Sequence, residues 1–326
     1  MELLDTLTIL WHGLGWPLLR LIFFISLGLL VGNLIESLNW THGIARLAAP
    51  LIRSGHLSDT AGASFSMAFF SGVAANTMLA EAFDQGRITK QELIFANLFN
   101  SLPTYFMHLP TLFFIAVPLI GRTALVYVGL TLFAAFLRTL VIVVVGRLVI
   151  APGPEPCITC RLDEEKTSGF RPAAVKTWER FRKRIKRILF FTVPIYIVIY
   201  ILGRQGLFDI LENFMADHLS ILAWLHPQTI SIVVFQLTAE LSAGLAVAGG
   251  LLDAGAIGEP EVVIALLAGN VISSPMRAVR HQLPFYSGIF RPRLAIELII
   301  YNQSFRMGSI LLVAMLYYFW SKGLMV

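Results

Sequence analysis

Residues 123–149 read TALVYVGLTLFAAFLRTLVIVVVGRLV, and Arg138 and Arg147 are the only charged residues among them. A helix needs about 20 mostly apolar residues to cross the hydrocarbon core of a bilayer. This stretch therefore predicts a membrane-spanning helix that carries one arginine, Arg138, deep inside it.

Seven further apolar windows lie before and after this stretch in the sequence. The whole chain of 326 residues is 56% hydrophobic and only 14% charged, whereas a soluble domain carries about 25% charged residues. The sequence therefore predicts an all-α integral membrane protein. Its net charge of +5 comes from basic residues in loops beside apolar segments, which is typical of a lipid bilayer partner and not of nucleic-acid binding. The windows are residues 16–38, 60–83, 91–121, 187–204, 228–252, 260–290 and 293–320.

The order of residues in the first part of the chain recurs in the second part. Asp84-Gln-Gly86-Arg-Ile88 is matched by Asp253-Ala-Gly255-Ala-Ile257, and Arg20-Leu-Ile-Phe-Phe by Arg187-Ile-Leu-Phe-Phe. These and later matches keep their order at a separation of 167–170 residues, which is typical of a duplicated unit. The later pairs are Glu92 with Glu261, Asn100 with Asn270, and Arg138 with Arg306.

The basic residues indicate how the two halves are oriented. If windows 60–83 and 228–252 crossed completely, the basic 277–293 loop would lie opposite the basic central linker, against the positive-inside rule. If both windows are re-entrant hairpins, the halves are inverted and most basic loops lie on one side. We therefore expect two inverted repeats, each with a spanning helix, an interfacial helix, a re-entrant hairpin, a proline-broken spanning helix and a final spanning helix.

This topology divides the chain into three parts. Residues 1–150 form the N-terminal repeat, residues 151–186 a basic linker, and residues 187–326 the inverted C-terminal repeat. We expect a multi-pass protein of the cell inner membrane with both termini outside and the linker in the cytoplasm. The basic linker segment also contains Trp178 and Phe181, which is typical of a helix that lies against anionic lipid.

Polar residues gather where the spans are interrupted. Proline disturbs the helical turn before it and frees backbone carbonyls, and broken helices and hairpins carry the solute sites of many transporters. Helix packing is the simpler explanation for any one such motif, because small polar residues are common between membrane helices. The candidate substrate-binding residues are Asn100 and Ser101 before Pro103, Asn270, Ser273 and Ser274 before Pro275, and Asn76, Thr77, Thr238 and Glu240 in the hairpins.

Arg138 and Arg306 lie at matching depths within their windows. Ionisable groups in the apolar core are costly and usually face a cavity or a counter-ion. Glu240 is the candidate counter-ion for one of them. The pair can therefore belong to a structural ion pair or to a site that recognises an anionic or hydrogen-bonding substrate.

The linker also contains Cys157-Ile-Thr-Cys160, the only two cysteines of the chain. Such a pair supplies half of a tetrahedral thiolate site, so a metal bound between two copies in a homo-oligomer is one hypothesis for it. We expect no other cofactor. No nucleophile elbow, phosphate loop or HExxH motif occurs, so we expect no enzyme.

The order of elements resembles that of the nucleoside recognition or Gate-domain membrane proteins. This family includes the spore-maturation proteins, the gate regions of ferrous-iron permeases and the core of concentrative nucleoside transporters. Gly269-Asn270-Val-Ile-Ser273-Ser274 is similar to the stretch of the unwound helix that holds the ribose in nucleoside transporters. The resemblance implies that Asn270 and Ser273 contact substrate, with Glu240 nearby in the second hairpin.

Together these features predict a transporter or permease-like protein that moves a small polar solute or ion through a mid-membrane site. The alternative is a non-transporting membrane assembly or regulatory factor of the spore-maturation type. In a transporter the polar groups should be available to a solute, whereas in an assembly factor they should bond to one another.

Overall fold

The computed structural model describes residues 7–16, 54–150, 170–206, 227–238 and 241–323, together with a few single residues between these ranges. Several parts of the prediction lie outside the described residues, among them most of the first span at 16–38, linker residues 151–169 with Cys157 and Cys160, and Glu240. Within the described ranges every regular element is a helix, in agreement with the expected all-α class.

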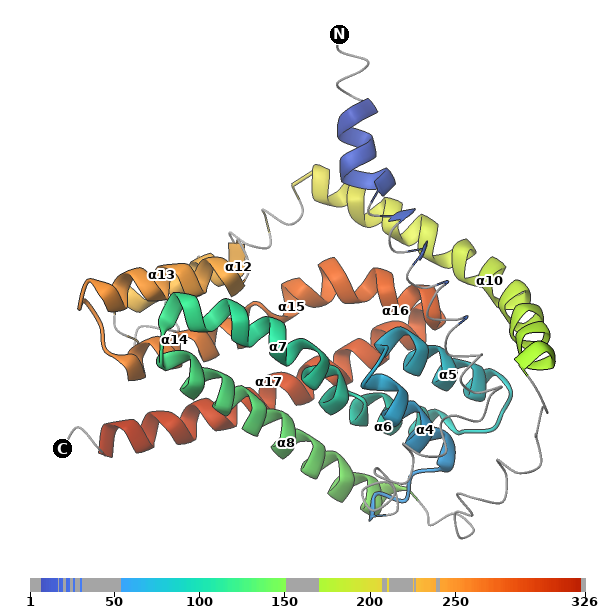
Figure 1. Ribbon diagram of the computed structural model, residues 1–326, viewed down its shortest axis with the longest axis horizontal. Coiled ribbons are helices and arrows are strands. Elements are labelled where there is room, and N and C mark those ends of the chain that lie inside the picture. The colour runs from blue at the N-terminus through green and yellow to red at the C-terminus, as the bar shows by residue number, and fades with distance from the viewer. Residues whose placement is uncertain are drawn as a thin grey trace. The chain divides into compact units, whose positions relative to one another are not determined.

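The helices follow one another as Figure 1 shows. Those of the first part are η1 (Trp11–Gly15), α4 (Asp59–Ala68), α5 (Gly72–Asp84), α6 (Lys90–Phe99), α7 (Ser101–Ile120), α8 (Thr123–Val149) and α10 (Phe170–Arg204). Those of the second part are η3 (Pro227–Thr229), α12 (Ile230–Thr238), α13 (Leu241–Asp253), α14 (Glu259–Ile272), α15 (Ser274–Arg277), η4 (Ala278–Gln282), α16 (Leu283–Ile289) and α17 (Pro292–Gly323).

Three of the described helices are long and apolar enough to cross a membrane: Lys90–Ile120, which joins α6 and α7, then α8, and Pro292–Ser321 within α17. At most 44% of the most apolar window in each is buried. Large apolar side chains such as Leu148 and Phe319 stay 80% and 70% exposed, which suits a surface that faces lipid rather than water. A fourth span is possible if the bent pair formed by residues 259–272 and 274–289 counts as one.

Window 60–83 forms two short helices, α4 and α5, that pack against each other. The chain leaves the helical conformation at Ser71, whose hydroxyl accepts a hydrogen bond from the backbone N–H of Ala74 at 3.1 Å. A serine at this position satisfies one of the free N–H groups at a helix start. Ser64 then links the two helices by donating to the carbonyl of Ala75 at 3.2 Å. The predicted hairpin is therefore present as two packed helices.

Window 228–252 forms a similar pair, α12 and α13, which also pack together. Gly244 allows this close packing, because a Cβ atom there would lie 3.1 Å from the carbonyl oxygen of Ile232 and would overlap the side chain of Gln236.

The turns after α5 and α13 explain the repeated Asp-x-Gly-x-Ile sequence. Gly86 and Gly255 have positive φ angles of 70° and 63°, a conformation that glycine adopts without strain. In both turns the residue after this glycine donates its N–H to a carbonyl five residues earlier, from Arg87 to Ala82 at 2.9 Å and from Ala256 to Leu251 at 3.0 Å. This is the hydrogen-bond pattern of a Schellman helix end.

The expected proline breaks differ between the two halves. In the second half α14 and α15 meet at Ser273 and the paired segments are bent by 45°. In the first half the interruption lies at Asn100, before Pro103, and Lys90–Ile120 runs on as one candidate span. Pro103 lies in the first turn of α7, where a backbone N–H has no partner within the helix, so it does not force a sharp bend.

The predicted basic interfacial segment and the predicted span at 187–204 form one continuous helix, α10.

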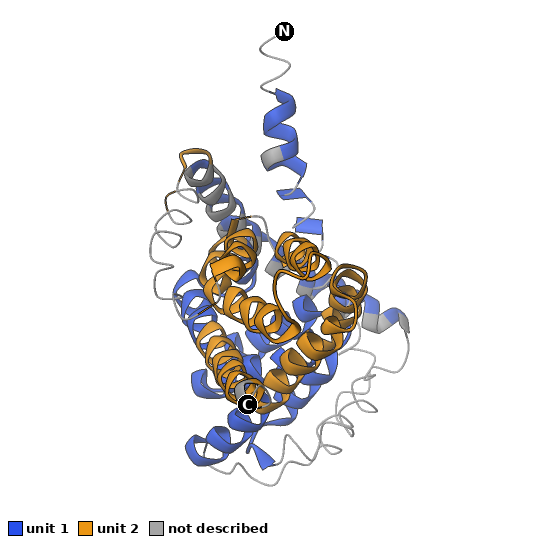
Figure 2. Cartoon of the chain, turned by 90° about the vertical axis from the view of Figure 1, so that its left-hand side faces the viewer, with its two compact units in different colours: residues 1–104, 139–201, 281–301 blue, residues 105–138, 202–280, 302–326 orange. Residues whose placement is uncertain are grey.

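The chain forms two compact units, coloured separately in Figure 2. Unit 1 consists of residues 1–104, 139–201 and 281–301, and unit 2 of residues 105–138, 202–280 and 302–326. Each unit therefore contains one complete hairpin together with helical segments that belong to the other half of the sequence.

Candidate functional site

Unit 1 gathers polar side chains from both halves of the chain. Nδ2 of Asn97 in α6 donates to Oδ1 of Asn76 in α5 at 2.8 Å. The same nitrogen lies 3.4 Å from the hydroxyl of Tyr286 in α16. All three side chains are less than 10% exposed. Asn76, a predicted hairpin residue, thus bonds to Asn97, which in turn contacts a tyrosine 189 positions later in the chain.

Asn100 lies at the junction of α6 and α7 and bonds to the other hairpin helix. Its Nδ2 donates to the hydroxyl of Ser64 in α4 at 2.7 Å. Its backbone carbonyl accepts from the hydroxyl of Thr104 at 2.7 Å and from the backbone N–H of the same residue at 3.2 Å. Asn100 is 4% exposed, and its Oδ1 has no hydrogen-bond partner among the described residues. Ser101 begins α7 and is partly exposed.

Thr77 follows Asn76 in α5 and is 1% exposed. Its hydroxyl has no hydrogen-bond partner within the described part of the chain, and neither does Oδ1 of Asn97. Buried polar atoms normally find partners. Unit 1 therefore keeps unused hydrogen-bonding capacity beside a network that is otherwise bonded to itself.

In unit 2, Asn270 is the centre of the polar contacts. It lies near the end of α14 and is 6% exposed. Its Oδ1 accepts from Nη2 of Arg277 at 2.6 Å and from Nη2 of Arg306 at 3.3 Å. Its backbone carbonyl accepts from the hydroxyl of Ser274 at 2.8 Å and again from Arg277 at 2.8 Å. The break between α14 and α15 thus frees a carbonyl, which the polar residues after the break satisfy.

Arg138 lies in the same unit as Arg306 and is 7% exposed. The two guanidinium groups are close enough to interact electrostatically, and Tyr105 interacts with both. The hydroxyl of Tyr105 lies 2.8 Å from that of Thr131. Arg138 and Arg306 therefore belong to one polar region of unit 2.

Two neutral side chains complete the polar region of unit 2. Ser273, 2% exposed, has a hydroxyl without a partner among the described residues. Gln236 in α12 is 3% exposed, and neither of its amide atoms has a partner within the described ranges. Gln236 packs closely against Gly269, where a Cβ atom would lie 2.8 Å from Cδ of Gln236. Because Gly269 has no side chain, α12 can pack close to the part of α14 that carries Asn270.

Some predicted residues do not join these clusters. Thr238 is exposed, and its hydroxyl bonds to the carbonyl of Val234 in its own helix at 3.0 Å. Glu240, Cys157 and Cys160 lie outside the described residues, so the counter-ion and metal hypotheses remain predictions. Among the residues that the structure describes, no group of three or more His, Cys, Asp or Glu side chains could hold a metal ion.

Several residues of the clusters were not among the predicted site residues. Ser64 and Gln236 are polar residues on apolar hairpin helices, and that contrast could have identified them. Tyr286 and Tyr127, whose hydroxyl lies 3.5 Å from Nδ2 of Asn270, carry no such signal. Arg277 follows the helix break closely in the sequence, and the structure places it in direct contact with Asn270.

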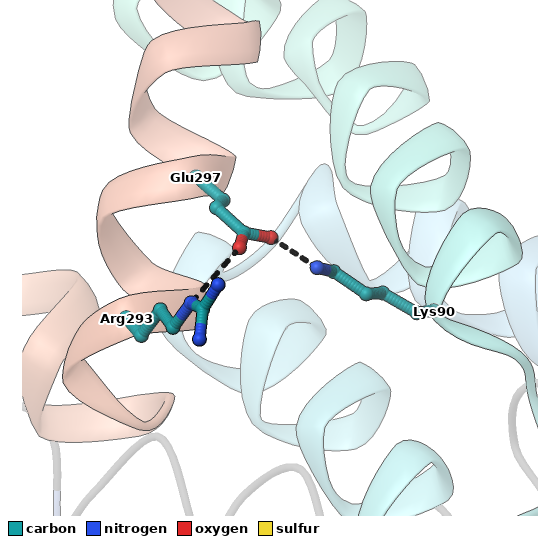
Figure 3. A network of polar contacts seen from close by, with 3 residues as sticks. All are labelled: Lys90, Arg293 and Glu297. Atoms are coloured by element: carbon teal, nitrogen blue, oxygen red, sulfur yellow. Dashed lines mark ion pairs between the residues drawn. The ribbon is translucent and has the colours of Figure 1, made fainter.

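Ion pairs join helices within each unit. In unit 1, Nζ of Lys90 lies 2.5 Å from Glu297, which also lies 3.7 Å from Arg293 (Figure 3). In unit 2, Nε of Arg122 lies 2.6 Å from Glu259. Lys90 is the first residue of α6 and Glu259 the first residue of α14, so corresponding helix starts carry opposite charges.

No family model matches the chain, and no solved structure matches it. It is similar to three proteins of Methanocaldococcus jannaschii that are described as uncharacterized. MJ0871 is 27% identical over 290 residues, which are 88% of each chain. MJ0880 is 24% identical over 307 residues, 92% of this chain and 97% of the relative, and MJ1556 is 25% identical over 294 residues, 87% of each. The similarity therefore extends over both halves, and none of these names assigns an activity.

Proposed function

We propose that this protein is a multi-pass membrane transporter of a small polar solute or ion, built from two inverted repeats. The observation that carries the proposal is the recurrence of a buried polar cluster at corresponding helix junctions, at Asn100 in unit 1 and at Asn270 in unit 2. A packing role alone gives no reason for the buried polar atoms of both clusters that have no partner among the described residues.

The helix bounds support a duplication. α5 begins at Gly72 and α13 at Leu241, and both helices have 13 residues. The starts of α6 and α14, and those of α8 and α17, are separated by the same 169 residues. Both turn glycines with positive φ, Gly86 and Gly255, also keep this separation. Repeated helix starts at one separation are what two copies of one unit produce.

The lengths of the hairpin helices support re-entrant segments. α4 has 10 residues and α5 has 13, which at 1.5 Å per residue correspond to about 15 and 20 Å. The hydrocarbon core is about 30 Å thick, so neither helix can cross it alone. Two short helices that enter and return are tolerated where protein or water satisfies the backbone at the turn.

The opposite charges at corresponding positions support inversion. Lys90 and Glu259 occupy the same place in the two halves. In inverted repeats these positions face opposite sides of the membrane, and the positive-inside rule favours a basic residue on the cytoplasmic side only. The proposed orientation therefore has Lys90 and the linker on the cytoplasmic side, and Glu259 and both termini on the outer side.

One observation favours the alternative of a non-transporting assembly or regulatory factor. In unit 1, Asn76 and Asn97 are bonded to each other and buried, as expected of a structural network. Both units nevertheless keep buried polar atoms without a partner among the described residues, at Thr77 and Asn100 in unit 1 and at Ser273 and Gln236 in unit 2. These atoms favour the transporter over the assembly factor.

Thermal unfolding in detergent tests the proposal. The purified protein is heated with nucleosides, which the family resemblance suggests, and with amino acids, small carboxylates and divalent metals. We expect one class to raise the unfolding midpoint, and Asn270→Ala to abolish that shift while Thr238→Ala, outside the cluster, retains it. A panel without effect on the native protein, or a shift that Asn270→Ala leaves unchanged, would favour the assembly factor.

The two native cysteines test the topology without any mutation. A membrane-impermeant maleimide should not label Cys157 and Cys160 in intact cells and should label both after permeabilisation. Labelling in intact cells would place the linker outside and reverse the proposed orientation.

A further inference from the structure

A buried amide joins the second hairpin to α14 without a hydrogen bond. Gln236 lies in α12 and is 3% exposed, and neither atom of its amide has a partner among the described residues. Burying a polar group without a hydrogen bond is costly, and buried amides normally find partners. This contact therefore weakens the fold unless a further group bonds to the amide.

Two glycines leave room for the side chain of Gln236. It lies against Gly244 in α13 and against Gly269 in α14, because a Cβ atom on either glycine would overlap it. Both neighbours lack a side chain, so neither can offer a polar side-chain group to the amide. The sequence thus accommodates a glutamine at this contact and leaves its hydrogen-bonding capacity unused.

The corresponding contact of unit 1 is bonded. There Asn100, at the end of α6, donates to the hydroxyl of Ser64 in α4 at 2.7 Å. Each contact joins the first helix of a hairpin to the helix before the break, α4 to α6 and α12 to α14. In unit 2 the amide comes from the hairpin and faces a glycine instead of a serine. A purely structural contact would keep the hydroxyl partner that unit 1 has.

A second unused group lies one turn further along α14. Ser273 is 2% exposed, and its hydroxyl has no partner within the described part of the chain. Its backbone N–H donates to the carbonyl of Gly269 at 2.9 Å, so both residues lie on one face of the helix, and helical side chains lean toward the helix N-terminus. Four residues rise about 6 Å. One polar atom that bonds to two groups at about 2.9 Å each spans a similar distance.

We infer that Gln236 and Ser273 bind a neutral polar group of a solute, an amide or a hydroxyl, between α12 and α14. A glutamine side chain presents a donor and an acceptor side by side. A group that both donates and accepts satisfies both atoms, whereas an anion leaves the acceptor unsatisfied and a cation leaves the donor unsatisfied. The role of this solute as the transported one rests on the proposed function, whereas its binding does not.

Gln236→Met tests the amide in the protein without ligand. Methionine is unbranched like glutamine and has a similar helix propensity, so it replaces the amide by an apolar group of similar shape. Removing an unbonded buried amide should raise the unfolding midpoint in detergent by about 2–6 °C. Asn100→Leu should lower the midpoint, because it removes the bond to Ser64. A midpoint of Gln236→Met that stays or falls, or failure of this variant to fold, would overturn the inference.

The ligand class is tested by heating the native protein with succinamide, with erythritol, or with potassium succinate, at ionic strength equalised with potassium chloride. We expect one of the two neutral probes to raise the unfolding midpoint and succinate to have no effect. No shift with either neutral probe, or a shift with succinate as large as theirs, would overturn the inference.

The variants then locate the site. Gln236→Met should abolish the shift, and Ser273→Ala should weaken binding of the effective probe about 2- to 10-fold, as expected when one hydrogen bond is lost. Thr238→Ala lies in the same helix, where the exposed hydroxyl bonds to the carbonyl of Val234, and should bind like the native protein. Native affinity in Gln236→Met, or in Ser273→Ala, would refute the assignment.

Flux into proteoliposomes distinguishes this inference from the proposed function. Uptake of the bound probe that Gln236→Met abolishes supports both. Binding without uptake leaves the neutral site standing and refutes transport of that solute. Uptake of a solute that Gln236→Met leaves unchanged supports transport and refutes the site at Gln236.

Discussion

Two adjacent glycines in α13 allow a sharp test of how unit 2 is packed. A Cβ atom on Gly249 would lie 3.1 Å from the carbonyl carbon of Leu119 in α7 and would overlap the carbonyl oxygen. A Cβ atom on Gly250 would meet nothing within 4 Å. Gly249→Ala and Gly250→Ala therefore make the same chemical change on neighbouring positions of one helix, with and without an obstacle.

The magnitudes follow from these surroundings. Each substitution gains at most about 1 kcal/mol of helix propensity. At position 249 the obstacle is backbone, which cannot rotate away as a side chain can, so overpacking should cost about 1–3 kcal/mol or more. Because the gain in helix propensity is common to both, the two variants should differ by the overpacking cost, about 1–3 kcal/mol or more, which corresponds to a difference in unfolding midpoint of at least about 2 °C for a chain of this size.

The assay is the unfolding midpoint of both variants in the same detergent, with the native protein alongside. Gly250→Ala should equal or exceed the native midpoint, and Gly249→Ala should lie well below it. Equal midpoints for the two variants would show that α13 does not pack on α7 as described, and would remove the basis for assigning these helices to one unit.

Two further predictions concern the polar contacts of unit 1. Asn97→Ala should lower the free energy of unfolding by about 1–3 kcal/mol, because it leaves the buried Asn76 without this partner. The double variant with Asn76→Ala should cost less than the sum of the two single changes. Strictly additive losses in chemical denaturation would contradict the hydrogen bond between the two asparagines. Lys90→Glu should lower the free energy of unfolding by only about 0.5–1 kcal/mol, because the ion pair with Glu297 is partly exposed. Adding Glu297→Lys reverses the pair and should restore the unfolding midpoint. A double variant that stays at the midpoint of the single variant would show that the ion pair has no energetic value.

The sequence predicted the class of fold and the places where helices are interrupted. Apolar length predicted the spans at 91–121, 123–149 and 293–320, and small polar residues predicted the hairpin at 60–83. The interruption in the first half also lies before its proline, at Asn100 ahead of Pro103, but Lys90–Ile120 runs on as one candidate span without a sharp bend. The sharp bend in the second half, at Ser273, lies where the sequence placed it.

The candidate site could be predicted only in part. Asn270, Ser273 and Ser274 were identifiable because they precede a proline in an apolar window. Thr238 was equally plausible, yet its hydroxyl bonds to the carbonyl one turn earlier, as threonines in helices often do. The tyrosines were not identifiable, because their hydroxyls meet the asparagines only through packing between helices that are far apart in sequence.

The division of each unit between distant parts of the chain also bears on how the protein is made. Unit 1 begins in the first 104 residues and is completed only by residues 281–301, about 200 residues later. At ordinary translation rates of about 5–20 residues per second, the first hairpin waits about 10–40 s for its last partners. During this interval Asn76 and Asn97 have each other but lack Tyr286, so a nascent chain halted between the two halves would expose an unfinished polar surface to the membrane insertion and quality-control machinery.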